Sequence, residues 1–392
     1  MGHHLGSKSS IIPLIDRLNK NPIGLVDSDK LRQILALLFS AEEAYIASKF
    51  PLEESTIDEL AKRTGIPAVE LLPKLDSMAE KGLVMDLPYS GTTYYLLMPG
   101  LIGFFEFTFM KKRADLPLPE LAQLMTEYLF ENGKQGQAKE FFGSKTSLTR
   151  SLVYDDVVPT TSDVTNYENA RKIITAAGYG AVGMCYCRHK KEHLGKSCEK
   201  QAAVEGTCIS LGVGARFMVR RGFAVEKSTE ELLAILDQAR ELKLTHITDN
   251  VRHKPSFICN CCSCCCELMA GVQSGFTEGI GKTPFLAAVD VEKCNVCGLC
   301  YTACNVAAIT APGDPDSACA VVDTQACLGC GACVPACTRG AISLVERDMR
   351  PLPPAKRKDM FVQILKEKGR LTPFLVSGAK KRVGRLLAKR KR

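Results

Sequence analysis

Two runs of closely spaced cysteines constrain this chain more than any other feature of its 392-residue sequence. Both runs have the spacing C-x2-C-x2-C-x3-C. The first consists of Cys294, Cys297, Cys300 and Cys304, and the second of Cys327, Cys330, Cys333 and Cys337. Two residues between cysteines allow three thiolates to converge on one centre while the backbone loops around it. We therefore expect a metal centre at each run.

The paired runs resemble the bacterial-type ferredoxin domain with two 4Fe-4S clusters, over residues 285–348. The resemblance implies two βαβ-like halves, written (βαβ)2, with the clusters buried between them and one-electron transfer at low potential. In such domains the last cysteine of each run crosses to the other cluster. The resemblance thus implies Cys294, Cys297, Cys300 and Cys337 as ligands of cluster 1, and Cys327, Cys330, Cys333 and Cys304 as ligands of cluster 2.

One departure from this family concerns the residue after each fourth cysteine. Proline is expected there, but the chain has Asn305 and Thr338. Since that proline only shapes the backbone, its loss bears on potential and stability more than on ligation. A pair of zinc sites built from C-x2-C pairs is the alternative, which four cysteines per run, twice in this order, disfavour.

A second cysteine field lies between residues 150 and 280. Its ten cysteines are Cys185, Cys187, Cys198, Cys208, Cys259, Cys261, Cys262, Cys264, Cys265 and Cys266. Six cysteines in the eight residues 259–266 cannot all be inert core residues, and disulfides are rare in a reducing compartment. We predict one or two further Fe-S clusters here, although not all ten thiols are expected to bind.

Adjacent cysteines restrict how these thiols can be shared. In an extended chain the side chains of Cys261 and Cys262 point in different directions. Either neighbouring cysteines serve different clusters, or the cluster is not a simple cubane. Residues 150–350 as a whole resemble a group of 4Fe-4S ferredoxin-like proteins of anaerobic bacteria. Their mark is the cysteine-rich pair at 185–190 and 258–266 ahead of a two-cluster domain, which implies architecture and cofactor class but no reaction.

Histidines and basic residues accompany the first of these cysteine groups. His189, His193 and His246 are candidate cluster ligands, since histidine ligates some Fe-S clusters. A solvated basic segment near an anionic cluster is the alternative for the first two. Arg188, Lys190 and Lys191 are placed to hydrogen-bond or offset the charge of thiolate ligands. Cys319 lies outside both runs, and we expect it to be a small buried residue.

The N-terminal part contains helical patterns and a hairpin. Apolar spacing predicts helices over 30–49 and 67–82, a capped helix from Ser55 to Gly65, and a hairpin with Ser90 and Gly91 at its tip. These elements resemble a winged helix-turn-helix domain. The second helix carries nearly balanced charge and no Gln, Asn or Arg, so DNA reading is disfavoured and a docking or dimerisation role is favoured.

These patterns predict a multidomain α+β chain. We expect a leader (1–29), a winged-helix-like domain (30–130), an α/β cysteine-rich domain (150–280), the ferredoxin-like domain (285–348), and a linker with a basic tail (349–392). The net charge of +8 is concentrated in the tail, where 380–392 hold eight basic side chains and no acidic one. An amphipathic basic helix of this kind can lie on an anionic membrane surface, so peripheral contact through 378–392 is one expectation.

Three functions stay open on the sequence alone. No secretory apolar run follows Met1, and thiols in a cytoplasmic chain are typically metal ligands. We expect an electron-transfer protein with redox partner proteins, and a second protomer is a further candidate partner. The alternatives are a reductase with chemistry at the middle cluster and a redox-sensing DNA-binding regulator. Gly212 and Gly214 lack the third glycine of a nucleotide fingerprint, which favours a redox subunit over a stand-alone enzyme.

Overall fold

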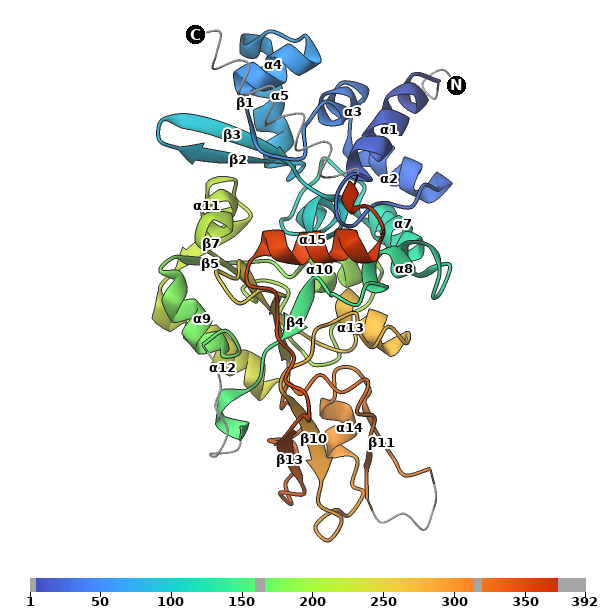
Figure 1. Ribbon diagram of the computed structural model, residues 1–392, viewed down its shortest axis with the longest axis vertical. Helices are drawn as coiled ribbons and strands as arrows, with labels where there is room; N and C mark the ends of the chain where they lie inside the picture. The colour runs from blue at the N-terminus through green and yellow to red at the C-terminus, as the bar shows by residue number, and fades with distance from the viewer. Residues whose placement is uncertain (1–4, 159–165, 314–318, 373–392) are drawn as a thin grey trace.

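The computed structural model describes residues 5–158, 166–313 and 319–372, so the basic segment 378–392 lies outside the described residues. The chain has an α+β fold. N-terminal helices and a small sheet occupy one end, a larger sheet lies in the middle, and two short two-stranded sheets form the other end (Figure 1). Within the described ranges, no helix combines the length and apolar character needed to cross a membrane.

The N-terminal part is mainly helical. Its elements are α1 (Leu5–Leu18), α2 (Asp29–Leu38), α3 (Ala41–Ser48), β1 (Ser55–Thr56), α4 (Ile57–Thr64), α5 (Ala68–Glu80), β2 (Val84–Tyr89), β3 (Thr92–Leu97), a π-helical turn (Gly100–Phe104), α6 (Phe105–Thr108), α7 (Leu118–Phe130) and α8 (Gly136–Phe142). The helix expected over 30–49 is two helices instead. Ser40 caps α3 through a capping box with Glu43, which stops α2 at Leu38.

The helix, turn and hairpin predicted between residues 55 and 97 are present. α4 begins at a capping box between Thr56 and Glu59 and ends at Gly65 in the left-handed conformation. β2 and β3 form the hairpin, and Ser90 and Gly91 at its tip both have positive φ, as two-residue hairpin turns require. β1 adds a third antiparallel strand beside β3 in the order β1-β3-β2.

The middle part surrounds a sheet with the strand order β4-β8-β9-β6-β5-β7, six strands within the described residues. Its elements are β4 (Thr149–Ser151), a 3-10 turn (Asp155–Val157), α9 (Ala170–Ala177), β5 (Gly180–Gly183), α10 (Tyr186–His193), β6 (Cys208–Leu211), α11 (Gly212–Arg220), β7 (Ala224–Lys227), α12 (Thr229–Glu241), β8 (Thr245–Asp249), β9 (Phe257–Cys261) and α13 (Glu267–Gln273).

The prediction of an α/β middle domain is wrong in its sheet type. Strands and helices do alternate along the chain, but every pairing between these named strands is antiparallel. The sheet type follows from the order in which the strands lie side by side, and the alternation of strands and helices along the chain does not determine that order. β5 lies between β6 and β7, so the connection through α11 skips a strand, and β8 and β9 pair as successive antiparallel strands.

The C-terminal cysteine segment, residues 285–346, has two similar halves. Its elements are β10 (Phe285–Val289), α14 (Leu299–Ala303), β11 (Ile309–Thr310), β12 (Val321–Val322) and β13 (Ile342–Glu346). β10 pairs with β13 and β11 with β12, both antiparallel. The first strand thus pairs with the last, and the two inner strands pair with each other.

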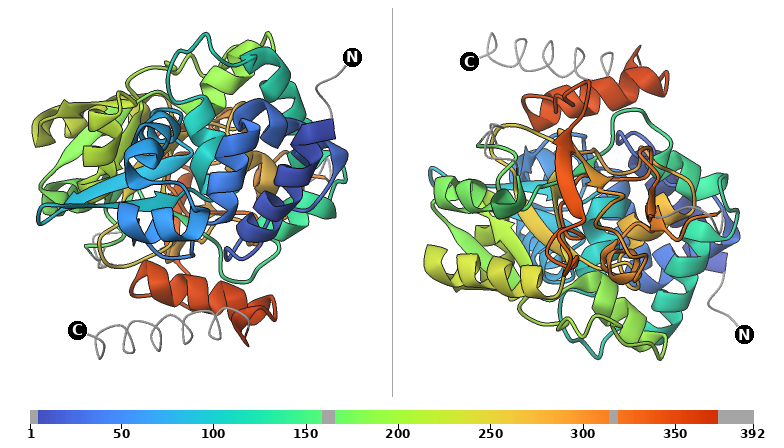
Figure 2. Two further views of the ribbon diagram at one scale, coloured as in Figure 1. Left: turned by 90° about the horizontal axis from the view of Figure 1, so that it is seen from above. Right: turned by 90° about the horizontal axis from the view of Figure 1, so that it is seen from below.

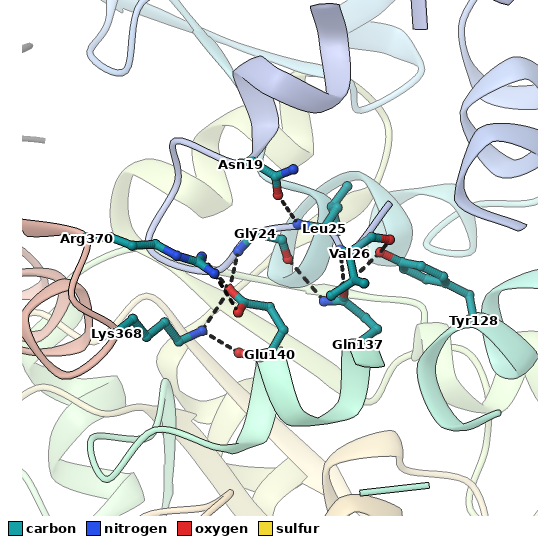
Figure 3. A network of polar contacts seen from close by, with 9 residues as sticks. All are labelled: Asn19, Gly24, Leu25, Val26, Tyr128, Gln137, Glu140, Lys368 and Arg370. Carbon is teal, nitrogen blue, oxygen red and sulfur yellow. Dashed lines mark hydrogen bonds and ion pairs between the residues drawn. The ribbon is translucent and has the colours of Figure 1, made fainter. Parts of the chain in front are cut away.

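The chain then returns to the N-terminal part through α15 (Arg357–Glu367), which lies on the outside of the molecule (Figures 1 and 2). Arg357 donates to Asp249 of β8 at 2.6 Å. Beyond α15, Lys368 and Arg370 both pair with Glu140 of α8 at 2.8 Å, and the same carboxylate accepts the Gly24 N–H (Figure 3). Gln137 and Tyr128 continue this network to Val26. Residues 368–370, called the C-terminal strap below, are thereby connected to residues 24–26 through α7 and α8.

One apolar core connects these parts. A continuous cluster of buried side chains extends from Ile11 in α1 to Ile364 in α15 and includes thiols of both cysteine fields. Phe107 of α6 packs edge-to-face on Phe217 and Phe223 of the middle part, with ring centroids 5.8 and 5.0 Å apart. Such contacts fix the N-terminal part against the sheet that carries the cysteines.

Candidate metal centres

The first candidate centre is the outer cavity, at the far end of the C-terminal cysteine segment. Its thiols are Cys294, Cys297, Cys300 and Cys337, which line this cavity together with other residues of the same segment. Cys297 is exposed and Cys300 is buried. The structure therefore brings three thiols of the first run together with the last thiol of the second run.

The second candidate centre is the inner cavity, which faces the middle part. Its thiols are Cys304, Cys327, Cys330 and Cys333, and Thr245 of β8 is also part of its lining. The Thr245 hydroxyl donates to the Cys330 sulfur at 3.5 Å. Burial raises the pKa of Cys330 to about 11, so a bound cation is needed to hold this thiol as a thiolate at neutral pH.

The two halves present their cysteines in the same way. The sulfurs of Cys304 and Cys337 each accept a backbone N–H from four residues further on, Ala308 and Ala341, at 3.2 Å. In the second half, Gly329 has a φ of +69°, and an added Cβ would lie 2.0 Å from the Phe285 carbonyl oxygen. This close approach requires glycine and lets the loop curl around the inner cavity.

The ten thiols of the second cysteine field divide into two groups. The four-thiol group consists of Cys198, Cys262, Cys264 and Cys265, whose sulfurs all lie within 4.8 Å of one another. In the six-thiol group, each thiol shifts the pKa of the next, in the order Cys185, Cys187, Cys266, Cys261, Cys259 and Cys208. Cys261 and Cys262 are adjacent in the chain but belong to different groups, and so do Cys265 and Cys266.

Local structure explains this division. Cys259 and Cys261 are two residues apart on β9 and share one face of the strand. After Cys261 the chain leaves the strand, and Cys262 joins the other group. Residues 263–265 form a turn, so Cys264 and Cys265 lie in the same group although they are adjacent. The side chains of adjacent cysteines therefore point to different groups at the end of the strand, but to the same group at this turn.

Two cysteines of the six-thiol group lie at the N-terminus of a helix. Cys185 is the N-cap of α10 and Cys266 is the N-cap of α13. A thiolate at a helix N-terminus is stabilised by the helix dipole and by the free N–H groups of the first turn. Cys208 begins β6 and precedes Ile209, which pairs with Ile258, the residue before Cys259 on β9.

Two cations, the buried Arg188 and the half-buried Lys200, act on the thiols of these groups. Arg188 is 2% exposed and donates to the carbonyl oxygens of Ala203 and Asn260. Burial alone would lower the pKa of Arg188, but the thiols of both groups raise it above its usual value. Cys262 and Cys264 of the four-thiol group, and Cys304 and Cys330 of the inner cavity, raise the pKa of Lys200 electrostatically, against the effect of its burial. Its ammonium donates to the carbonyl of Ala303, directly before Cys304.

Asn305 follows the fourth cysteine of the first run, where the family pattern has proline, and it joins the C-terminal cysteine segment to the middle part. Its side chain is buried; it donates to the Lys243 carbonyl at 2.7 Å and to the Thr245 hydroxyl at 2.9 Å. Its oxygen accepts the N–H of Ser263, between Cys262 and Cys264, at 3.2 Å. Thr338, at the other missing proline, is exposed. The two departures from the family pattern therefore have different surroundings.

The three histidines hydrogen-bond to protein groups. The ring nitrogen Nδ1 of His189 lies 2.8 Å from the Phe109 carbonyl oxygen, and its Nε2 lies 3.2 Å from Nε2 of His193. His246 on β8 contacts the side-chain oxygen of Asn260 at 2.7 Å. Burial lowers the pKa of His246 to about 4, so this ring is neutral. These contacts favour structural roles for the three histidines.

A polar network borders the six-thiol group. Lys190 of α10 forms a buried ion pair with Glu267 of α13, which also accepts a hydrogen bond from Tyr186 at 3.2 Å. Nearby Glu106 accepts the Gly103 N–H at 2.6 Å, and burial raises the pKa of Glu106 to about 8. Sequence reasoning identified Lys190 but missed Tyr186, Glu267 and Glu106. Adjacency to Cys185, Cys187 and Cys266 was a signal for the first two, whereas nothing local pointed to Glu106.

Four thiols around each of two cavities, and ten more in two groups, define an iron–sulfur protein. Comparison with known families agrees, since residues 320–343 match the family model of the 4Fe-4S binding domain. This match covers the second cysteine run. No curated protein and no solved structure matches the chain.

Proposed function

We propose that this chain is an electron-transfer protein that passes single electrons between a redox partner and the middle part through two 4Fe-4S clusters. The observation that carries the proposal is the placement of the inner cavity against the middle part. Asn305 lines this cavity and accepts the Ser263 N–H, between Cys262 and Cys264, and Lys200 donates to the Ala303 carbonyl next to Cys304. Each cavity offers the four thiols that a cubane needs at its corners. A bound 4Fe-4S cluster supplies reversible one-electron exchange.

The path would begin at the outer cavity. Cys297 is exposed there, whereas Cys327 and Cys333 at the inner cavity are buried. The outer centre is therefore the more accessible of the two to a partner. Lys200 and Arg188 offset the negative charge that thiolate-ligated centres bring into the interior, which makes added electrons less costly there.

The winged-helix-like segment has an internal docking role in this proposal. Arg220 and Arg221, at the end of α11, both pair with Asp86 of the hairpin strand β2. Arg221 also pairs with Asp76 of α5 at 2.7 Å. Both the wing and the second helix are therefore attached to the middle part, which disfavours DNA reading by this surface. A redox-sensing regulator is the weaker alternative.

A reductase is the second candidate, and the six-thiol group favours it. Six thiols exceed the four iron corners of a cubane, so a larger or differently ligated cluster is implied. Tyr186, Glu267 and Glu106 border this group with hydroxyl and carboxyl groups that can carry protons. Electrons from the inner cavity and protons from these side chains would then meet at one site.

Iron and acid-labile sulfide on anaerobically purified full-length protein, with EPR of the dithionite-reduced state, test the proposal. Two cubanes predict at least about eight irons and eight sulfides per chain, and EPR signals of reduced 4Fe-4S clusters. Zinc in place of iron at the two cavities would refute electron transfer. Catalytic reoxidation of the reduced protein by a small-molecule acceptor, faster than by a redox protein, would favour the reductase.

A further inference from the structure

The four-thiol group differs from the two cavities in one measurable respect, which is the separation of its sulfurs. Cys198 lies 3.7 Å from Cys262 and 3.7 Å from Cys264, and Cys264 lies 3.5 Å from Cys265. Within the described part of the chain, this is the group whose potential ligand atoms all lie within 4.8 Å of one another. The sulfurs of the two cavities instead surround open space.

These separations match one tetrahedral ion. With a metal–sulfur bond of about 2.3 Å, the edge of a tetrahedron is 1.63 times longer, or about 3.8 Å. A cubane places four irons and four sulfides between its thiolates, so its sulfurs stand well beyond contact distance. Disulfide bonds between these cysteines are also excluded, because an S–S bond of about 2.05 Å is far shorter than the sulfur–sulfur distances in this group.

The surroundings also fit such a site. Cys262 and Cys265 are 1% and 3% exposed, and Cys198 and Cys264 are partly buried. Four thiolates and a divalent ion carry a net charge of −2, and the cations Arg188 and Lys200 interact electrostatically with thiols of this group. Four protein ligands leave no open position, as in closed structural metal sites.

We propose that Cys198, Cys262, Cys264 and Cys265 bind a single thiophilic ion in tetrahedral geometry, either zinc or mononuclear iron, rather than a 4Fe-4S cluster. The site ties the loop at residue 198 to the turn at 262–265, beside both the inner cavity and the six-thiol group. Iron at this position would add a one-electron relay between them, and zinc would add a redox-silent brace. The proposal does not depend on the electron-transfer function.

The test compares metal and sulfide content in two variants of the full-length, anaerobically purified chain. Cys198→Ser is expected to lose about one equivalent of zinc or of iron and no acid-labile sulfide. The matched control is Cys319→Ser, which changes a partly buried thiol outside all four groups and is expected to lose neither. Loss of about four irons together with four sulfides from Cys198→Ser would overturn the proposal, because that is the content of a cubane.

Wild-type protein gives an independent answer if Cys198→Ser fails to fold. One zinc per chain by elemental analysis identifies zinc. Absence of zinc with a mononuclear ferric EPR signal after mild oxidation, and iron in excess of sulfide by about one equivalent, identifies iron. Absence of zinc with equal amounts of iron and sulfide refutes the single-ion site.

Discussion

Replacing Asn305 should loosen the contact between the C-terminal cysteine segment and the middle part. In Asn305→Ala, the side chain loses its hydrogen bonds to the Ser263 N–H, the Lys243 carbonyl and the Thr245 hydroxyl. A buried hydrogen bond contributes about 1 kcal/mol net, so the three together contribute about 3 kcal/mol to docking. At about 1.4 kcal/mol for each factor of ten, the open state becomes on the order of 100-fold more populated.

Hydrogen exchange of the cluster-loaded protein measures this opening directly, because exchange reports local unfolding without requiring a global transition. Peptides covering 243–245 and 259–266 should exchange on the order of 100-fold faster in Asn305→Ala, since these segments lose their partner. Thr338→Ala is the matched control, as it changes the equivalent but exposed residue after the other fourth cysteine. Equal exchange in wild type and Asn305→Ala, or equal acceleration in both variants, would refute the docking role.

Two further predictions address the cluster ligands and the C-terminal strap. Cys337→Ala should remove about four irons and four sulfides from the outer cavity and leave the inner cavity, which Cys304 lines, loaded. Cys304→Ala should empty the inner cavity and leave the outer cavity loaded. Loss of the same EPR signal in both variants would contradict crossed ligation. Burial would raise the pKa of Glu140, but hydrogen bonds from Arg370 and Lys368 lower it below its usual value of 4.5. Its stabilisation is therefore complete above that pH and is lost as pH falls through the lower folded pKa. Glu140→Gln should destabilise the chain by about 2 kcal/mol at pH 7 and by less at pH 4 in urea unfolding, and a constant difference would argue against the ion pairs.

The sequence was most informative where chemistry depends on local spacing. The two C-x2-C-x2-C-x3-C runs indicated eight thiols, and the structure groups them in the crossed arrangement that the family resemblance implies. A capping residue and glycine turns likewise predicted α4 and the hairpin. These features are encoded within a few residues, so they can be recognised without knowledge of the tertiary fold.

Features that depend on which distant segments meet were not predictable. The antiparallel order of the middle sheet follows from strand neighbours, which alternation of strands and helices leaves undetermined. The partition of Cys261 and Cys262 into different groups could be anticipated from side-chain alternation, but the pairing of Cys264 with Cys265 needed the turn to be seen. Lys200 gave no signal, because its partners at Ala303 and Lys243 are distant in sequence.

Asn305 shows how a departure from a family pattern can indicate an interface. A proline at this position would have neither the amide oxygen that accepts the Ser263 N–H nor the amide nitrogen that donates to Lys243 and Thr245. Those contacts connect the residue after one cluster ligand to the turn that carries the four-thiol group. Electron transfer requires a short and constant separation between centres, and three hydrogen bonds from one buried side chain provide it more directly than a stiffer backbone would. The exposed Thr338 faces no such neighbour among its described contacts, so replacement of both prolines has a structural reason at one position and none at the other.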